Sequence, residues 1–437
     1  MPHHALAELA RSMRAPLLHV RLGSITAVVI SKPDLARASL TTNDAALASR
    51  PHLLSAQILS FGCSDVTLAP AGPYHRMARG VVVSELLSAR RVTTYGRARV
   101  SEVRRLLAHV ATKSTSPETP VDLSACLFNM ANDVLCRVAF GRRFPRDKGD
   151  RLAAVLAEAQ NLFAGFTIGD FFPELEPIAS TVTGLRRRLN KCYADLRAIC
   201  ENIVDDHISK PMRLQEEEDS SASRRYVHGR HGHHVVDDGV GDDGARPPSP
   251  VLRKAQDEVR RVVGAKGHVE ESHLGGLRYL RAIIKEAFRL HPTVPLLVPR
   301  ESVAPCSLGG YDIPAKTRVF INTFAMGRDP EIWENPLQFS PERFGGKIDL
   351  KDHDYRLLPF GAGRRGCPGY TFAQATMELT LASLLYHFEW ALPAGVRTED
   401  VSLQETFGLA SKKRDPLLVA VTKNHEYEFK GEELQEH

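Results

Sequence analysis

The stretch that decides the fold lies at residues 355 to 370 and reads Tyr-Arg-Leu-Leu-Pro-Phe-Gly-Ala-Gly-Arg-Arg-Gly-Cys-Pro-Gly-Tyr. It contains one spaced pattern, Phe360-x-x-Gly363-x-Arg365-x-Cys367-x-Gly369. Cys367 stands alone among glycines without a Cys-x-x-Cys partner, so the loop lacks the several protein ligands that zinc requires. A single thiolate instead suits one axial position of a metal that already has its other ligands.

Haem iron bound by a cysteine thiolate is such an arrangement, and the thiolate favours O–O cleavage. In that setting the glycines allow the backbone to approach the sulfur and the porphyrin closely. Arg365 can pair with a haem propionate and help to keep the thiolate ionised. Phe360 supplies an apolar wall that limits solvent access to the iron. The structural alternative is an inert buried cysteine in a tight turn.

This stretch resembles the haem-binding loop of the cytochromes P-450, the haem-thiolate monooxygenases, most closely those of the plant microsomal type. The resemblance implies a mainly α cytochrome P-450 fold, with a helix-rich haem domain and a smaller β-containing lobe. It also implies that Cys367 is the axial ligand of haem b iron and that Gly369 lies at the cofactor. We therefore expect a single haem domain over residues 1–437.

The bulk composition is that of a soluble globular protein. Hydrophobic residues make up 43% of the 437 residues and charged residues 25%, with a formal net charge of +5. So modest a charge argues against a dedicated nucleic-acid binder. Seven irregularly spaced cysteines indicate free thiols rather than a disulfide framework. No apolar run is long enough to span a bilayer, so we expect no membrane anchor in this chain, although microsomal relatives carry one.

The N-terminal residues predict the β-containing lobe, over residues 1–70. Helical periodicity covers residues 5–13, and two strands over 19–22 and 27–30 flank Gly23, which predicts a hairpin. A short helix over 33–40 begins after Lys32.

A Pro/Gly loop then enters a helix that carries His75 and Arg79 one turn apart, on one helix face. In the resembled family the matching helix carries Trp-x-x-x-Arg, and both side chains contact a haem propionate. Arg79 fits that pattern, and His75 stands where Trp is usual but retains an N–H that can donate. The alternative is a solvated basic face.

Amphipathic helices are expected over 121–144, 150–163 and 182–208. Between them, residues 171–175 read Phe-Phe-Pro-Glu-Leu, an aromatic loop broken by proline. Such a loop can either roof a lipophilic pocket or belong to the core.

The segment 213–250 departs from the family pattern. Residues 220 to 250 contain no Leu, Ile, Phe, Met or Trp, so they read as a disordered linker or as a metal-binding tract through His228, His231, His233 and His234. The family places its oxygen-activating helix here, with a motif like Ala-Gly-x-Asp-Thr-Thr. With permitted codons, residues 225–238 read one nucleotide out of frame give DMFMAGTDTTSST. We therefore interpret 225–249 as a frameshifted or mis-spliced central helix, and an inactive degenerate relative as the alternative.

Helical periodicity returns after Val251 and defines a haem-binding C-terminal half over 251–422, followed by a charged tail over 423–437. One helix carries Glu286 and Arg289 three residues apart, and Pro341-Glu342-Arg343-Phe344 follows downstream. The resemblance makes Glu286, Arg289 and Arg343 a buried charge triad that holds the haem loop in place. It makes Arg300 another propionate ligand. A long helix is expected to start at Gly369, with its positive N-terminal dipole directed at the thiolate.

The resemblance also implies a function. A small lipophilic substrate would lie against Val294, Leu297 and Phe407, and one oxygen atom from O₂ would be inserted with electrons that NADPH supplies through a cytochrome P-450 reductase. Basic residues near the loop, among them Arg364, suggest a face for an acidic reductase. The family location is the cytoplasmic face of the endoplasmic reticulum membrane. Rival interpretations are a haem-thiolate isomerase or dehydratase, and a non-enzymatic metal- or partner-binding protein.

Overall fold

The computed structural model describes residues 1–113, 120–141, 143, 146–163, 166–209, 249–345, 354–406, 408–424 and 426–427. The α-helices are α1 (Pro2–Ser12), α2 (Pro33–Leu40), α3 (Leu54–Leu59), α4 (Pro73–Val81), α5 (Ala89–Thr94), α6 (Gly96–Lys113), α7 (Leu123–Phe140), α8 (Arg146–Leu162), α9 (Ile168–Phe171), α10 (Glu176–Val182), α11 (Leu185–Ser209), α12 (Pro250–Val263), α13 (Arg278–Leu290), α14 (Thr323–Gly327) and α15 (Tyr370–His387). The strands are β1 (Leu17–Leu22), β2 (Ile25–Ile30), β3 (Val121–Asp122), β4 (Arg300–Glu301), β5 (Cys306–Leu308), β6 (Tyr311–Ile313), β7 (Arg318–Ile321), β8 (Phe388–Ala391), β9 (Glu405–Thr406), β10 (Lys412–Lys413) and β11 (Leu418–Lys423).

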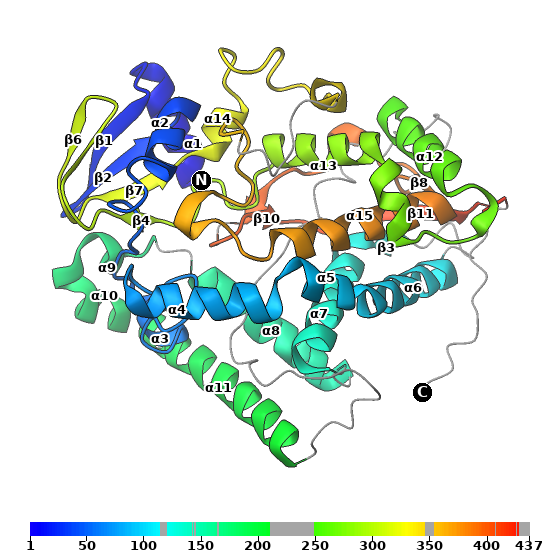
Figure 1. Cartoon of the computed structure of the whole chain (residues 1–437), viewed down its shortest axis with the longest axis horizontal. Coiled ribbons are helices and arrows are strands. Elements are labelled where there is room, and N and C mark those ends of the chain that lie inside the picture. Colours follow the sequence, from blue (N-terminus) through cyan, green and yellow to red (C-terminus); the bar gives the residue numbers. More distant parts are fainter. Residues whose placement is uncertain are drawn as a thin grey trace.

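The β-containing lobe is built from both ends of the chain. Its four-stranded sheet has the order β1-β2-β7-β4, and β2 pairs in parallel with β7 through Ala27 and Arg318. The sequence assigned this lobe to residues 1–70, but strands from the C-terminal half complete it. In Figure 1 the lobe lies at the left of the molecule, and α6 and α12 lie at the opposite end.

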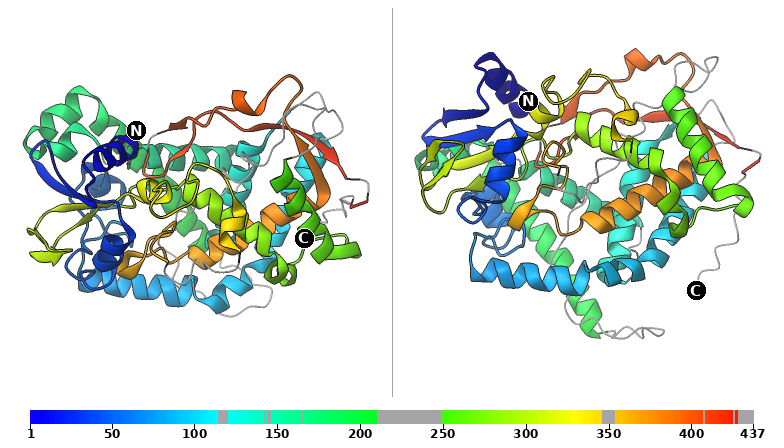
Figure 2. Two further views of the ribbon diagram at one scale, coloured as in Figure 1. Left: turned by 90° about the horizontal axis from the view of Figure 1, so that it is seen from above. Right: turned by 45° about the horizontal axis from the view of Figure 1, so that its top comes forward.

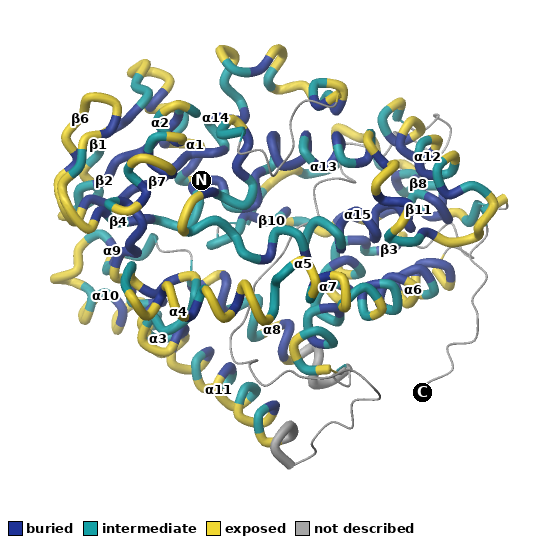
Figure 3. Tube along the Cα trace, in the orientation of Figure 1, coloured by how far each residue is buried: buried dark blue, intermediate teal, exposed yellow. Residues whose placement is uncertain are grey.

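The main core surrounds α15, which runs through the helical part of the molecule (Figure 2). Most α15 residues from Thr376 to His387 are buried, and the helix packs against α6, α12 and α13. Figure 3 shows the contrast between these buried helices and the more exposed α4, α10 and α11. Because α15 begins immediately after the cysteine loop, the core fixes the position of that loop.

Several segments differ from the sequence prediction. The aromatic loop expected over 171–175 lies between the short helices α9 and α10 and contains a 3₁₀ turn, and Thr167 and Asp170 form a capping box at the start of α9. The strands β3, β5, β8, β9, β10 and β11 were not predicted. The tract at 213–248 lies outside the described residues, so the predictions for 225–249 have no structural counterpart except at Ser249, which caps α12.

One helix among the described residues, α7, is long and apolar enough to cross a membrane, by length and composition only. Core helices of soluble proteins pass the same test. Leu123, Leu127, Met130 and Val134 of α7 belong to the main core.

Candidate functional site

The loop that carries Cys367 is closed by short backbone hydrogen bonds. The Cys367 amide donates to the Phe360 carbonyl at 2.8 Å, and the Gly366 amide donates to the Gly363 carbonyl at 3.0 Å. Gly369 is buried and caps the N-terminus of α15. The sulfur therefore lies close to the positive end of a long helix, where a thiolate is stabilised.

Electrostatics at Cys367 act in two directions. Burial raises the pKa of the thiol, while a backbone hydrogen bond from Gly369 and the charge of Arg79 lower it. The Arg79 guanidinium reaches the same loop, where Nη2 donates to the Gly366 carbonyl at 2.7 Å. A positive metal centre at the sulfur would lower the pKa of the thiol and favour the thiolate.

Four guanidinium groups gather beside the loop. Arg50 donates to the carbonyls of Thr67, Val298 and Pro299. Arg365 donates to the carbonyls of Ala48 and Ala69, each at 2.6 Å. Arg79 and Arg300 complete the cluster. Burial, followed by the charges of Arg300 and Arg79, lowers the pKa of Arg365 to about 10.

Arg300 is held on its carboxylate partner rather than left free. Nη1 forms an ion pair with Asp44 at 2.7 Å, and Nη2 donates to the Ala362 carbonyl at 2.9 Å. The other Asp44 oxygen accepts from the Arg364 amide at 2.7 Å. Asp44 thus links the β-containing lobe to the cysteine loop.

His75 faces this cluster from α4. The side chain is buried, and Nε2 has no hydrogen-bond partner among the described residues. Burial and the charges of Arg365, Arg79 and Arg50 lower the pKa of His75 to about 4. The ring is therefore neutral near pH 7.

These features allow a test of whether haem fits. Arg365 Nη1 is also buried without a partner, so Arg365 Nη1 and His75 Nε2 are two buried nitrogens that lack a hydrogen-bond acceptor among the described residues. Asp44 and Asp65 are the carboxylates that act on the four guanidinium groups. An anion beside a lone cysteine would satisfy both donors and the excess charge, because buried cations require a counter-charge. The residues present fit a metal porphyrin with two carboxylates.

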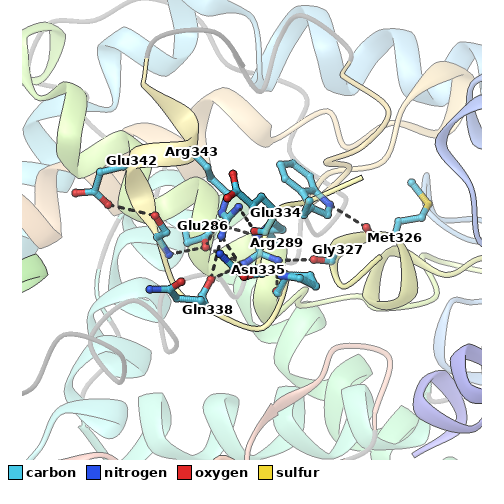
Figure 4. A network of polar contacts seen from close by, with 12 residues as sticks. Glu286, Arg289, Met326, Gly327, Glu334, Asn335, Gln338, Glu342 and Arg343 are labelled. Carbon is cyan, nitrogen blue, oxygen red and sulfur yellow. Dashed lines mark hydrogen bonds and ion pairs between the residues drawn. The ribbon is translucent and has the colours of Figure 1, made fainter. Parts of the chain in front are cut away.

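The Glu286, Arg289 and Arg343 side chains are in contact (Figure 4). Arg289 binds both Glu286 oxygens, at 2.7 and 2.8 Å, and Arg343 Nε donates to Glu286 Oε1 at 3.0 Å. The Glu286 and Arg289 side chains are fully buried. The Ser340 amide, at 2.7 Å, also donates to Glu286 Oε1.

The hydrogen bonds of this triad reach residues 327–340 rather than the cysteine loop itself. Arg289 donates to the carbonyls of Gly327, Pro336 and Gln338. Its connection to the loop is through rings, since Phe288 of α13 meets Phe360 edge-to-face at 5.6 Å. Phe360 also meets Tyr370, at 5.7 Å.

Two of the three expected pocket residues lie in the described chain. The Leu297 amide donates to the Val294 carbonyl at 2.9 Å, and Leu297 lies opposite Gly361 of the cysteine loop. Both side chains are half-buried. Phe407 lies outside the described residues.

Sequence reasoning missed Asp44 and Arg50. Neither has a partner nearby in the sequence, and the contacts of Asp44 with Arg300 and Arg364 span 256 and 320 residues. Sequence periodicity and motif spacing do not predict contacts between residues so far apart in the chain.

Comparison with known proteins gives a consistent assignment. The family model described as "Cytochrome P450" matches residues 1–222 and 249–418, and so passes over 223–248. A protein named "Tryptamine 5-hydroxylase" from Oryza sativa subsp. japonica is 70% identical over 468 aligned residues, which cover 100% of this chain and 89% of that protein. Since the alignment is longer than this chain of 437 residues, it opens gaps in this chain.

More distant relatives agree. "Cytochrome P450 71AP13" from Prunus mume is 42% identical and "Strychnine-11-hydroxylase" from Strychnos nux-vomica is 37% identical, covering 96% and 97% of this chain and 86% and 88% of their own lengths. A solved zebrafish cytochrome P450 with progesterone has a TM-score of 0.75 and 22% identity over 97% of this chain and 100% of the other. This last likeness concerns the fold alone.

Proposed function

The chain belongs to the cytochrome P450 family, an oxygen-incorporating class of oxidoreductases, and we propose that it binds haem b through Cys367 and hydroxylates a small lipophilic substrate. The observation that carries this proposal is the lone Cys367 beside four guanidinium groups, of which those of Arg50 and Arg300 are buried and the other two half-buried. Haem, when bound, supplies the activation of O₂. Electrons come from NADPH through a reductase.

The residues of the chain have separate tasks in this proposal. Cys367 would hold the haem iron through its sulfur, and the Gly369 amide and Arg79 favour the ionised form of the thiol. Arg365 Nη1 and His75 Nε2, which are buried without a partner, would hold the propionates, and Arg79 and Arg300 would add positive charge. Phe360, packed between Phe288 and Tyr370, keeps water from the sulfur.

For the substrate, we extend the proposal to tryptamine, hydroxylated at ring position 5. Support comes from the rice relative of that name, which is 70% identical across this whole chain. The substrate would lie against Val294, Leu297 and Phe407. Apolar walls of this kind suit an indole ring, because ligand pockets are lined mainly by hydrophobic side chains.

The test is co-expression of the full chain with a plant reductase and assay of tryptamine turnover. We expect NADPH-dependent formation of the hydroxylated indole, lost in Cys367→Ala. Turnover without NADPH and reductase would favour the isomerase interpretation instead.

If an acidic reductase docks on the basic residues near the cysteine loop, the rate of haem reduction should fall as salt is added. A reduction rate that does not change with salt would contradict this docking. We place the enzyme at the cytoplasmic face of the endoplasmic reticulum membrane.

The segment 223–248, which the family model passes over, bears on activity. The chain has no Ala-Gly-x-Asp-Thr-Thr motif, and we propose that a shifted reading frame explains why the motif is missing. Sequencing the transcript across codons 213–251 tests this. A pair of compensating shifts would restore the helix, whereas a transcript encoding the printed residues would identify a relative with impaired oxygen activation.

A further inference from the structure

A cluster of two histidines and one glutamate lies where α1 meets β9, outside the haem-binding residues. His3 Nε2 is 3.1 Å from a Glu405 carboxylate oxygen. Ligand atoms of His3, His4 and Glu405 all lie within 4.8 Å of one another. The His3 and Glu405 side chains are 1% and 10% exposed, whereas His4 is exposed. The cluster is therefore anchored in the interior and open to solvent on the His4 side.

Neighbouring residues fix the orientation of the two imidazole rings. Asn322 Nδ2 donates to the His3 carbonyl at 3.1 Å, which holds the start of α1 against α14. Phe324 stacks on the His4 ring at 4.4 Å and meets the His3 ring edge-on at 5.0 Å. Glu405 pairs across the β9–β10 hairpin with Lys413. The three groups are thus presented by packed elements.

The chemistry of the three groups is that of a transition-metal site. Neutral imidazole and carboxylate are ligands that zinc accepts, at roughly 2.0 to 2.2 Å, with water completing the shell. Arg328 and the Met1 amino group add positive charge near His4 and oppose a cation. Glu405 supplies the compensating negative charge.

We propose that His3, His4 and Glu405 bind a divalent transition-metal ion of the zinc type, which ties α1 to the β9–β10 hairpin. The tie joins residues 402 positions apart. Residue 407, assigned to the substrate pocket, follows β9 directly in the chain. Metal binding at this site therefore restrains β9, the strand that precedes residue 407 in the chain.

The test uses the full haem-loaded chain in which His228, His231, His233 and His234 are replaced by alanine, so that the His-rich tract cannot contribute. Zn²⁺ is titrated by calorimetry, and Co²⁺ reports the ligands through its visible absorption. In this background we expect one zinc ion to bind and the thermal midpoint to rise with zinc. Co²⁺ should show no sulfur-to-metal charge transfer, because no cysteine belongs to the cluster.

The variants His4→Ala and Glu405→Gln should each weaken zinc binding at least about tenfold and abolish the rise in the thermal midpoint. Glu405→Gln keeps the size of the side chain, so its loss of binding is separable from misfolding. The matched control is His268→Ala, since His268 is an exposed histidine 3.3 Å from Glu270 and lies elsewhere. Zinc affinity that is equal in His4→Ala, Glu405→Gln and the background would overturn the proposal.

Discussion

At the residue scale, Arg365 and Arg364 are adjacent but differ in what they contact. Arg365 donates to the carbonyls of Ala48 and Ala69, and its Nη1 is buried without a partner. The Arg364 side chain, in contrast, is 59% exposed. A hydrogen bond to a charged group contributes about 1.5–3 kcal/mol. We expect Arg365→Gln to weaken haem retention roughly tenfold to hundredfold, measured as haem transfer to apomyoglobin, and Arg364→Gln to leave it nearly unchanged. Equal rates for the two variants would contradict the assignment.

Gly363 shows a second residue-scale constraint. Its φ is +69°, and a Cβ would lie 2.6 Å from the Leu40 carbonyl oxygen and 2.7 Å from Asp44 Oδ2. Gly62 has a similar φ of +74° with nothing nearby. Gly62→Ala should therefore cost only the left-handed strain, about 1–2 kcal/mol, while Gly363→Ala should cost clearly more and also reduce haem content. Chemical denaturation of both variants measures the difference, and equal losses would argue against a tight contact at Asp44.

At the element scale, the Glu286 network joins α13 to residues 327–343. Glu286→Gln leaves Arg289 buried without its counter-charge, and breaking a buried pair in this way costs about 3–5 kcal/mol. Glu342→Gln is the control, because the Glu342–Lys254 pair is about half exposed, and such pairs contribute about 0–1 kcal/mol. Thermal unfolding should separate the two variants widely. A small effect of Glu286→Gln would mean that the triad does not hold this segment.

The C-terminal end of α15 predicts a pH dependence. Burial lowers the pKa of His387, whose Nδ1 lies 2.8 Å from the Tyr427 carbonyl. The unfolded chain protonates this histidine near pH 6.5, whereas the folded chain protonates it only at lower pH. The contribution of His387 to the free energy of unfolding therefore keeps its full value above pH 6.5 and decreases as the pH drops below 6.5. His387→Gln should flatten the dependence of stability on pH below pH 6.5, and the control His19→Gln, at an exposed histidine of β1, should not. An unchanged slope in His387→Gln would contradict the assignment.

Elements with a regular apolar stripe were predictable from the sequence. The helix expected to carry Glu286 and Arg289 is α13, in which Leu280, Ile284 and Phe288 are buried at intervals of four residues, and the helix expected at Gly369 is α15. The short helices at 168–182 were missed because aromatic residues and prolines interrupt any periodicity. The pairing of β2 with β7 was also missed, since local pattern says nothing about contacts between distant strands.

At the scale of the whole molecule, the family motifs identified the cysteine loop and the residues of the triad in advance. They did not identify Asp44, which links the β-containing lobe to that loop. They also did not identify Arg50, which adds a buried positive charge beside the other arginines of the site. Both depend on the folded arrangement of segments that are far apart in sequence. The four guanidinium groups beside the cysteine loop, two of them buried and two half-buried, come from separate segments of the chain.

The measurement that tests the central claim most directly is the reduced CO difference spectrum of the full chain beside Cys367→Ala. The account predicts a thiolate-type spectrum for the natural residue and its complete loss in the variant, with Cys306→Ala as an unaffected control. A thiolate-type spectrum that survives Cys367→Ala, or haem bound by the wild-type chain without that spectrum, would contradict the claim that Cys367 is the iron ligand.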